Sequence, residues 1–95
     1  MREPVVYIMA SCRNGTLYTG VTSDLSRRTF EHRTRAKPSF ASRHKCILLV
    51  WYEPYERMDE AIAREKQIKA GSRKDKLKLI EAMNPQWQDL YESLA

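Results

Sequence analysis

Two tyrosines, an arginine and a histidine lie close together near the start of this sequence and could act on a phosphate group. They are Tyr7, Tyr18, Arg28 and His32. Arg28 and His32 are one helical turn apart, so on a helix they would share a face, and the arginine could hold a phosphate by bidentate hydrogen bonds. The plainer interpretation is two core tyrosines on strands and a solvated basic helix.

Glu65 is a charged residue at a position where an apolar one is expected. An apolar stripe at helical spacing is formed by Met58, Ala61, Ile62 and Ile68. Glu65 falls on the same stripe, which should face the core. A carboxylate in such a position needs an ion-pair partner, a metal ion or access to a cleft. A salt bridge to a nearby arginine or lysine is the plainer alternative, and the spacing alone does not decide between these.

The elements that must position these residues begin with a hairpin and a helix. Residues 5–10 and 17–22 are rich in strand-forming residues, and Asn14-Gly15 between them is a strong turn signal. A helix is expected over about residues 24–35, before Lys37-Pro38 interrupts it.

Single residues within this segment carry further expectations. Gly20 lies inside the second strand, which indicates a close approach by another backbone or by a ligand. Thr22 or Ser23 is the expected N-cap of the helix, and Asp24 would be favourable at its positive end.

The second half of the chain predicts one more strand and further helices. Residues 46–52 form a continuous apolar run, as expected for a strand that is covered on both faces. Helices are expected from about Met58 to Gly71 and over residues 74–83, with a short one over 87–94. The order β-β-α-β-α-α predicts a small α/β (α+β) domain that spans residues 1–95, with three mostly antiparallel strands covered by helices.

The charge of the chain favours a polyanionic partner. The 95 residues carry a formal net charge of +5 and a sequence pI of about 9.4. The basic residues between positions 27 and 45 are opposed only by Glu31 and resemble a phosphate-facing surface. The candidate nucleic-acid-binding residues in this stretch are Arg27, Arg33, Arg35, Lys37, Arg43 and Lys45.

Composition also excludes several classes of protein. No stretch approaches the ~20 apolar residues that span a bilayer, and no apolar signal region is visible at the start. Cys12 and Cys46 show no metal-ligand spacing and are too few for a disulfide framework. We therefore expect a cytoplasmic protein with reduced thiols and no membrane partner.

The motif residues resemble the GIY-YIG nuclease superfamily. The resemblance runs from Val5-Val6-Tyr7 and Tyr18-Thr19-Gly20 through Arg28, His32 and Glu65 to the segment that begins at Asn84-Pro85. It is strongest to small stand-alone bacterial proteins related to the N-terminal nuclease domain of the bacterial excinuclease. Valines replace the glycine and isoleucine of the first motif, threonine replaces the isoleucine of the second, and Val21 stands where some relatives carry lysine.

The resemblance implies a three-stranded antiparallel sheet flanked by helices and a role for each matching residue. Tyr7 and Tyr18 would be the motif tyrosines, Gly20 the motif glycine, Arg28 the catalytic arginine, His32 a tyrosine-or-histidine position, Glu65 the metal-binding glutamate and Asn84 a residue that closes the site. One divalent ion, Mg²⁺ or Mn²⁺, would assist the reaction. The sequence does not decide whether Tyr7, Tyr18 or His32 is the general base. An unperturbed tyrosine has a pKa of about 10 and is a poor base near neutral pH, whereas His32 needs less help.

The leading hypothesis is therefore a metal-dependent endonuclease that hydrolyses DNA phosphodiester bonds in DNA repair or recombination. Branched or nicked DNA is the candidate substrate, and a protein partner could supply target choice. The alternative is a nucleic-acid-binding module without turnover that acts with a partner protein. A structural or interaction protein is the third alternative.

Overall fold

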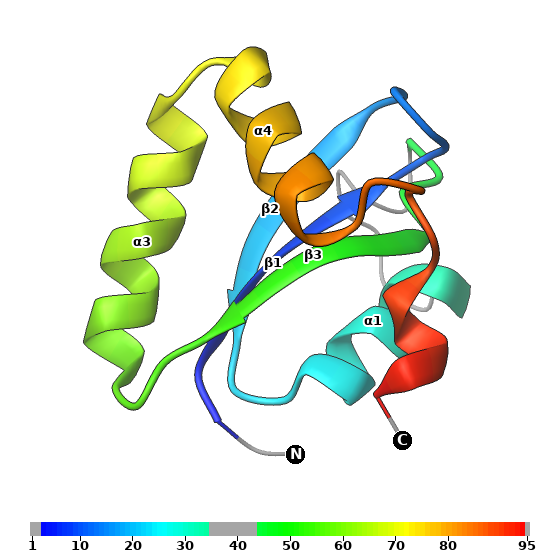
Figure 1. The fold of residues 1–95 in the computed structure, drawn as a ribbon. Coiled ribbons are helices and arrows are strands. Elements are labelled where there is room, and N and C mark those ends of the chain that lie inside the picture. The colour runs from blue at the N-terminus through cyan, green and yellow to red at the C-terminus, as the bar shows by residue number, and fades with distance from the viewer. Residues whose placement is uncertain (1–2, 35–43, 95) are drawn as a thin grey trace.

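Three strands form one antiparallel sheet in the order β2-β1-β3, so the strand that comes first in the sequence is the central one (Figure 1). The computed structural model describes residues 3–34 and 44–94. The elements are β1 (Val5–Ala10), β2 (Leu17–Thr22), α1 (Leu25–Thr34), β3 (Leu48–Pro54), α3 (Met58–Ala70), α4 (Arg73–Met83) and the 3₁₀ helix η1 (Leu90–Ser93). The predicted order β-β-α-β-α-α and the helix-flanked antiparallel sheet are confirmed.

The central strand β1 is buried on both of its faces. Each of its six side chains is at most 1% exposed. Tyr7 lies opposite Gly20 of β2 and opposite Tyr52 of β3. Because successive side chains of a strand point to opposite faces, Tyr7 and its neighbour Ile8 belong to different layers of the protein.

Helices cover both faces of the sheet. In Figure 1, α3 and α4 lie on one face, and α1 and η1 lie on the other. The first layer packs Ala61, Ile68 and Ile80 against Val6 and Ile8. The second layer joins strand residues to α1 and η1 and contains Val5, Tyr7, Met9, Leu25, Cys46 and Leu49, with Tyr18, Tyr52, Leu90, Tyr91 and Leu94 packed against them.

Two helix starts follow ordinary capping chemistry. The carboxylate of Asp24 accepts a hydrogen bond from the Arg27 N–H at 3.2 Å, so Asp24 caps α1 and the prediction of Thr22 or Ser23 as the cap was wrong. The Thr22 hydroxyl instead accepts a hydrogen bond from the Asp24 N–H at 3.1 Å. At the start of α4, Ser72 and Asp75 form a reciprocal capping box.

The ends of two predicted elements differ for local reasons. β3 covers 48–54 rather than 46–52, because Lys45 has a left-handed φ of 56° and the strand runs on to pair Pro54 with Val5. The predicted helix over 87–94 is reduced to η1. Trp87 has a φ of 55°, which lies outside the helical region and delays the turn until Leu90.

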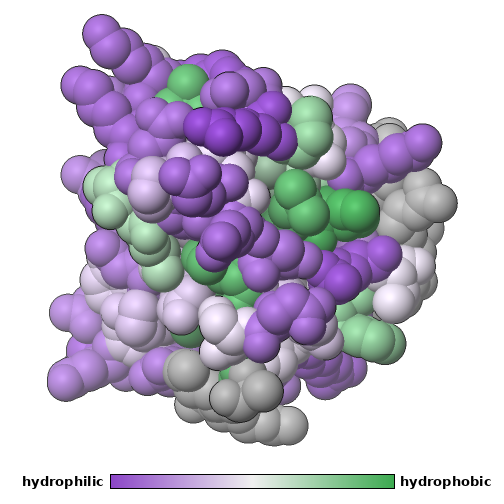
Figure 2. Space-filling model, turned by 45° about the vertical axis from the view of Figure 1, so that its right-hand side comes forward, coloured by the Kyte–Doolittle hydropathy of each residue, from purple (hydrophilic) through white to green (hydrophobic). Residues whose placement is uncertain are grey.

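One face of the molecule is mainly hydrophilic (Figure 2). Figure 2 shows purple side chains over most of the visible face, with green apolar side chains gathered in a limited area near its middle. Within the part of the chain that the structure describes, no helix combines the length and apolar character that a membrane crossing requires.

Candidate active site

Tyr7, Tyr18 and His32 form one aromatic cluster between the sheet and α1. The Tyr7 hydroxyl and His32 Nε2 are 2.9 Å apart in a buried hydrogen bond. The ring centroids are 6.3 Å apart for Tyr7 and Tyr18, 5.8 Å for Tyr7 and His32, and 5.3 Å for Tyr18 and His32. Side chains from β1, β2 and α1 therefore meet at one place.

Gly20 makes room for the Tyr7 ring. A Cβ at position 20 would lie 2.6 Å from both Cζ and Oη of Tyr7. The sequence predicted a close approach at Gly20, and the structure shows that the side chain of Tyr7 on the neighbouring strand, not its backbone, makes this approach. Any larger residue would push the tyrosine away from His32.

The buried face of α1 carries Leu25, Thr29 and His32, and Arg28 lies at its margin. The Arg28 side chain is 42% exposed, and its Nε lies 3.4 Å from Glu31 Oε1. A polar pocket of about 210 Å³ opens beside it and is lined by Thr22, Ser23, Asp24, Arg27, Arg28 and Glu31. Arg28 therefore lines a polar pocket, and its positive charge also acts on Tyr7 and His32.

Burial controls the protonation of the Tyr7–His32 pair. It raises the pKa of Tyr7 well above the ordinary value, Tyr18 adds to this, and the charge and hydrogen bond of Arg28 only partly oppose it. Burial and then the charge of Arg28 lower the pKa of His32, while Glu31 acts in the other direction. Both groups are therefore neutral near pH 7, and the imidazole can accept a proton.

Glu65 is placed apart from this cluster. It lies on α3, which packs on the opposite face of the sheet, and its Oε2 is 3.1 Å from Lys69 Nζ, one turn along the helix. The Glu65 side chain is 15% exposed, against 50% for Lys69. The ion pair that the sequence offered as the plainer alternative is thus present.

The donor set at Glu65 suits only a weakly held, hydrated ion. Among residues 3–34 and 44–94, no group of three or more His, Cys, Asp or Glu side chains could hold a metal. Mg²⁺ keeps several waters and commonly binds proteins through one or two carboxylates, so a single glutamate fits this ion. The ammonium of Lys69 would have to move aside for it.

Asn84 has a clear structural function. It is buried, and its Nδ2 donates to the carbonyls of Val50 at 3.2 Å and Gln88 at 2.8 Å. Its Oδ1 accepts from the Gln88 N–H at 3.0 Å. These bonds tie the end of α4 to β3, and a direct function at a phosphate would require some of them to break.

The predicted nucleic-acid-binding residues separate into different groups. Arg27 is 71% exposed and pairs with Glu31 at 3.5 Å. Arg33 instead pairs with Asp89 and stacks over the Tyr91 ring at 4.7 Å from its centroid. Lys45 is exposed in the turn before β3. The remaining predicted residues, Arg35, Lys37 and Arg43, lie outside the described residues.

Asp89 is the residue that the sequence did not single out. Its Oδ1 accepts from the N–H groups of Leu49 and Tyr91, each at 3.1 Å, and its Oδ2 accepts from Arg33. It therefore links β3, η1 and α1. An aspartate before a short helix signals an N-cap, but no local signal indicates the bond to Arg33, which is distant in the sequence.

Comparisons with known proteins agree with this architecture. The model of the GIY-YIG catalytic domain matches residues 3–78. A UPF0213 protein of Staphylococcus saprophyticus is 35% identical over 80 residues, which cover 84% of this chain and 96% of the relative. A UPF0213 protein of Staphylococcus aureus is 37% identical over 80 residues and covers the same shares.

A solved structure extends the similarity to three dimensions. The solution NMR structure of the UPF0213 protein BH0048 from Bacillus halodurans is similar with a TM-score of 0.57 and 26% sequence identity, over 92% of each chain. Tyr7, Tyr18, Arg28, His32 and Glu65 all lie within the range that the GIY-YIG model matches. The chain therefore belongs to the GIY-YIG family.

Proposed function

We propose that this chain is a metal-dependent endonuclease that hydrolyses DNA phosphodiester bonds. The observation that carries the proposal is the buried 2.9 Å hydrogen bond between Tyr7 and His32, in a chain that matches the GIY-YIG catalytic domain. A neutral histidine hydrogen-bonded to a phenol, with two arginines lining the adjacent polar pocket, suits proton removal from water beside a phosphate.

We assign the proton transfer to the Tyr7–His32 pair. Tyr7 alone is a poor base, because burial raises its pKa and disfavours the phenolate. If DNA binding admits water to the buried Tyr7 hydroxyl, the hydroxyl can pass its proton to His32 Nε2 while it accepts one from that water, and no free phenolate needs to form. Tyr18 is half-buried at the same cluster and is the candidate for orienting the water.

Arg28 would hold the scissile phosphate. Its guanidinium is partly exposed in the polar pocket, and the same charge acts on both Tyr7 and His32. Negative charge that develops on the phosphate is stabilised by a fixed cation, and loss of one such group typically costs about 10²–10³ in rate. Glu31, which contacts Arg27 and Arg28, keeps both arginines in place until the phosphate arrives.

A divalent ion is the proposed cofactor, with Mg²⁺ or Mn²⁺ as the candidates and Glu65 as its ligand. When bound, the ion would supply positive charge at the phosphate and leaving oxygen. Because α3 and the aromatic cluster belong to different layers of the protein, the ion and the phosphate would have to meet at an edge of the sheet. α3 packs against β2, the edge strand that carries Tyr18, so this edge is the candidate path.

Cleavage by matched variants tests the proposal. Purified protein is incubated with branched, nicked and single-stranded DNA in Mg²⁺ or Mn²⁺. Arg28→Ala is expected to lower the cleavage rate about 10²-fold or more, while the exposed Arg57→Ala leaves it unchanged. Glu65→Gln should abolish metal-dependent cleavage. Glu60→Gln on the same helix is its control and should leave cleavage unchanged. Equal cleavage by wild type, Arg28→Ala and Glu65→Gln would indicate a contaminating nuclease and exclude the proposal.

The biological setting that we propose is DNA repair or recombination in the cytoplasm, with branched or nicked DNA as substrate and a protein partner for target choice. It is supported by the resemblance to the excinuclease nuclease domain. A preference for the branched and nicked substrates over the single strand in the same cleavage assay would support it.

A nucleic-acid-binding module without turnover is the second candidate function. The observation that favours it is the ion pair between Glu65 and Lys69, which occupies the one proposed metal ligand. Salt-dependent DNA binding without cleavage in Mg²⁺ or Mn²⁺ would select this alternative.

A further inference from the structure

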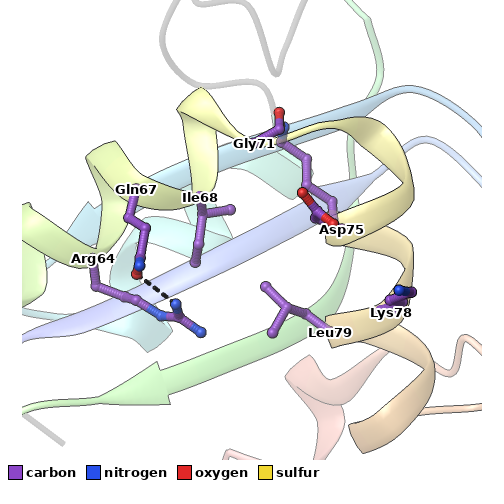
Figure 3. A pocket seen from close by; sticks show the side chains of 8 residues that line it. Arg64, Gln67, Ile68, Gly71, Asp75, Lys78 and Leu79 are labelled. Carbon is purple, nitrogen blue, oxygen red and sulfur yellow. Dashed lines mark hydrogen bonds between the residues drawn. The ribbon is translucent and has the colours of Figure 1, made fainter.

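A groove lies between α3 and α4, where the chain turns at Gly71 (Figure 3). Its volume is about 340 Å³, at the lower end of the range of roughly 300–1,000 Å³ for ligand pockets. The groove belongs to the layer that covers the opposite face of the sheet from Tyr7 and His32. Whatever binds there leaves the polar pocket beside Arg28 accessible.

The floor of the groove is apolar. Ile68 of α3 and Leu79 of α4 point toward each other across the gap in Figure 3. Ile68 is 5% exposed and belongs to the core, and Leu79 packs against the same core. The floor is therefore a fixed part of the fold and can accept one apolar side chain.

The rim of the groove is polar and mainly cationic. Its lining side chains are Arg64, Gln67, Asp75, Lys76 and Lys78. The carboxylate of Asp75 is turned to the backbone N–H of Ser72, 3.3 Å away, as part of the capping box. Asp75 keeps its negative charge, so the rim carries three cations, Arg64, Lys76 and Lys78, against one carboxylate and is positive in balance.

The cations are held in place by the protein itself. Arg64 Nε lies 3.0 Å from Glu53 Oε1, and its Nη1 donates to Gln67 Oε1 at 2.6 Å. Lys76 Nζ donates to the carbonyl of Gly71 at 3.0 Å. Arg64 and Lys76 are half-buried, whereas Lys78 is exposed. The rim is thus a partly ordered cationic border around an apolar floor.

We propose that this groove docks an acidic segment of a partner protein that presents one apolar side chain flanked by carboxylates. The apolar floor would bury the side chain, and the cationic rim would face the carboxylates. A DNA backbone would use the cations but would leave the floor of Ile68 and Leu79 without a function. The inference goes beyond the proposed nuclease function and does not depend on it.

The test uses the full chain and a defined probe, the peptide acetyl-Asp-Glu-Leu-Glu-Asp-amide. Amide chemical shifts of the ¹⁵N-labelled protein are followed during titration at low salt. Shifts are expected at Gln67, Ile68 and Leu79, with a dissociation constant on the order of 1 mM or below. A peptide with Ser in place of Leu tests the apolar floor and should bind at least several-fold more weakly.

Matched variants separate docking from general attraction. Lys78→Glu at the rim should weaken peptide binding roughly three- to tenfold, while Lys74→Glu, exposed on the same helix but outside the groove, should not. Absence of shifts in the groove, or equal weakening by both variants, would overturn the proposal. So would a short DNA duplex that shifts the same amides more strongly than the peptide, because the groove would then be a nucleic-acid surface.

Discussion

Burial favours the uncharged form of His32, and this lowers the stability of the folded chain at acid pH. The pKa of His32 is lower in the folded chain than the ordinary value of about 6.5. Below pH 6.5 the unfolded chain therefore binds a proton that the folded chain resists. The free energy of unfolding must fall as the pH decreases through this window.

The pH dependence of stability checks this residue directly. Between about pH 7.5 and 5.5, the free energy of unfolding from denaturant titrations should decrease, with His32 contributing at most about 1.4 kcal/mol per pH unit. His32→Asn should flatten this dependence. An unchanged slope in His32→Asn would show that His32 titrates alike in both states.

Gly20 offers a second test, because its hydrogen is in contact with the Tyr7 ring. Gly20→Ala would place a methyl group 2.6 Å from the Tyr7 hydroxyl oxygen, and the resulting overpacking should cost about 1–3 kcal/mol of stability. Gly71→Ala is the control, since its nearest contact is 3.3 Å to the end of the Asp75 side chain. Thermal unfolding of the two variants should show a clear loss for the first only. Similar midpoints would mean that Tyr7 can move away freely.

α1 is positioned by a contact near its C-terminal end as well as by its buried face. Arg33 follows His32 directly, and its bond to Asp89 anchors the helix to η1 and β3. A helix of ten residues has little stability by itself, so such tertiary contacts fix its position. The geometry of the Tyr7–His32 hydrogen bond therefore depends on a segment near the other end of the chain.

Asp89→Asn tests this anchor. The amide retains an oxygen for the N–H groups of Leu49 and Tyr91 but removes the charge that Arg33 requires, and should cost about 1–3 kcal/mol. Hydrogen exchange in α1 should accelerate. Glu92→Gln is the control, because that carboxylate is 78% exposed, lies 3.8 Å from Arg33 and should matter by less than about 1 kcal/mol. Equal protection of α1 in both variants would contradict the anchor.

Local patterns predicted the elements well and the long-range contacts poorly. The runs of strand-forming residues defined 5–10 and 17–22 correctly, and helical spacing placed Arg28 near the same buried face as His32. The same spacing could not show that α3 covers the other face of the sheet, which separates Glu65 from the tyrosines. The Asp89–Arg33 bond was also beyond reach, because a side-chain contact across 56 positions leaves no local trace.

The distribution of charge over the whole molecule determines how DNA would be held. The net charge of +5 favours DNA binding, but a given arginine contributes a specific contact only if its guanidinium can reach a phosphate. Arg27 is exposed beside the polar pocket, whereas Arg33 is engaged within the protein. We therefore expect Arg27 to contact phosphate and Arg33 to act through the position of α1.

Salt dependence of DNA binding measures this contribution. A plot of log K against log salt concentration should be linear, and Arg27→Gln should reduce the magnitude of its slope by about 1. Arg57→Gln, another exposed arginine that precedes α3, should leave the slope unchanged. If both variants alter the slope equally, the protein attracts DNA by its overall charge and not through a surface beside Arg28.

The central place of β1 in the sheet affects how the chain can fold during synthesis. β1 leaves the ribosome before both of its neighbours, and the hairpin with β2 can close early because only a short loop separates them. Its other edge stays unpaired until Leu48–Pro54 have emerged. Until then, a strand whose six side chains are all buried in the folded protein exposes open hydrogen-bonding groups, which is the kind of edge that pairs with other chains.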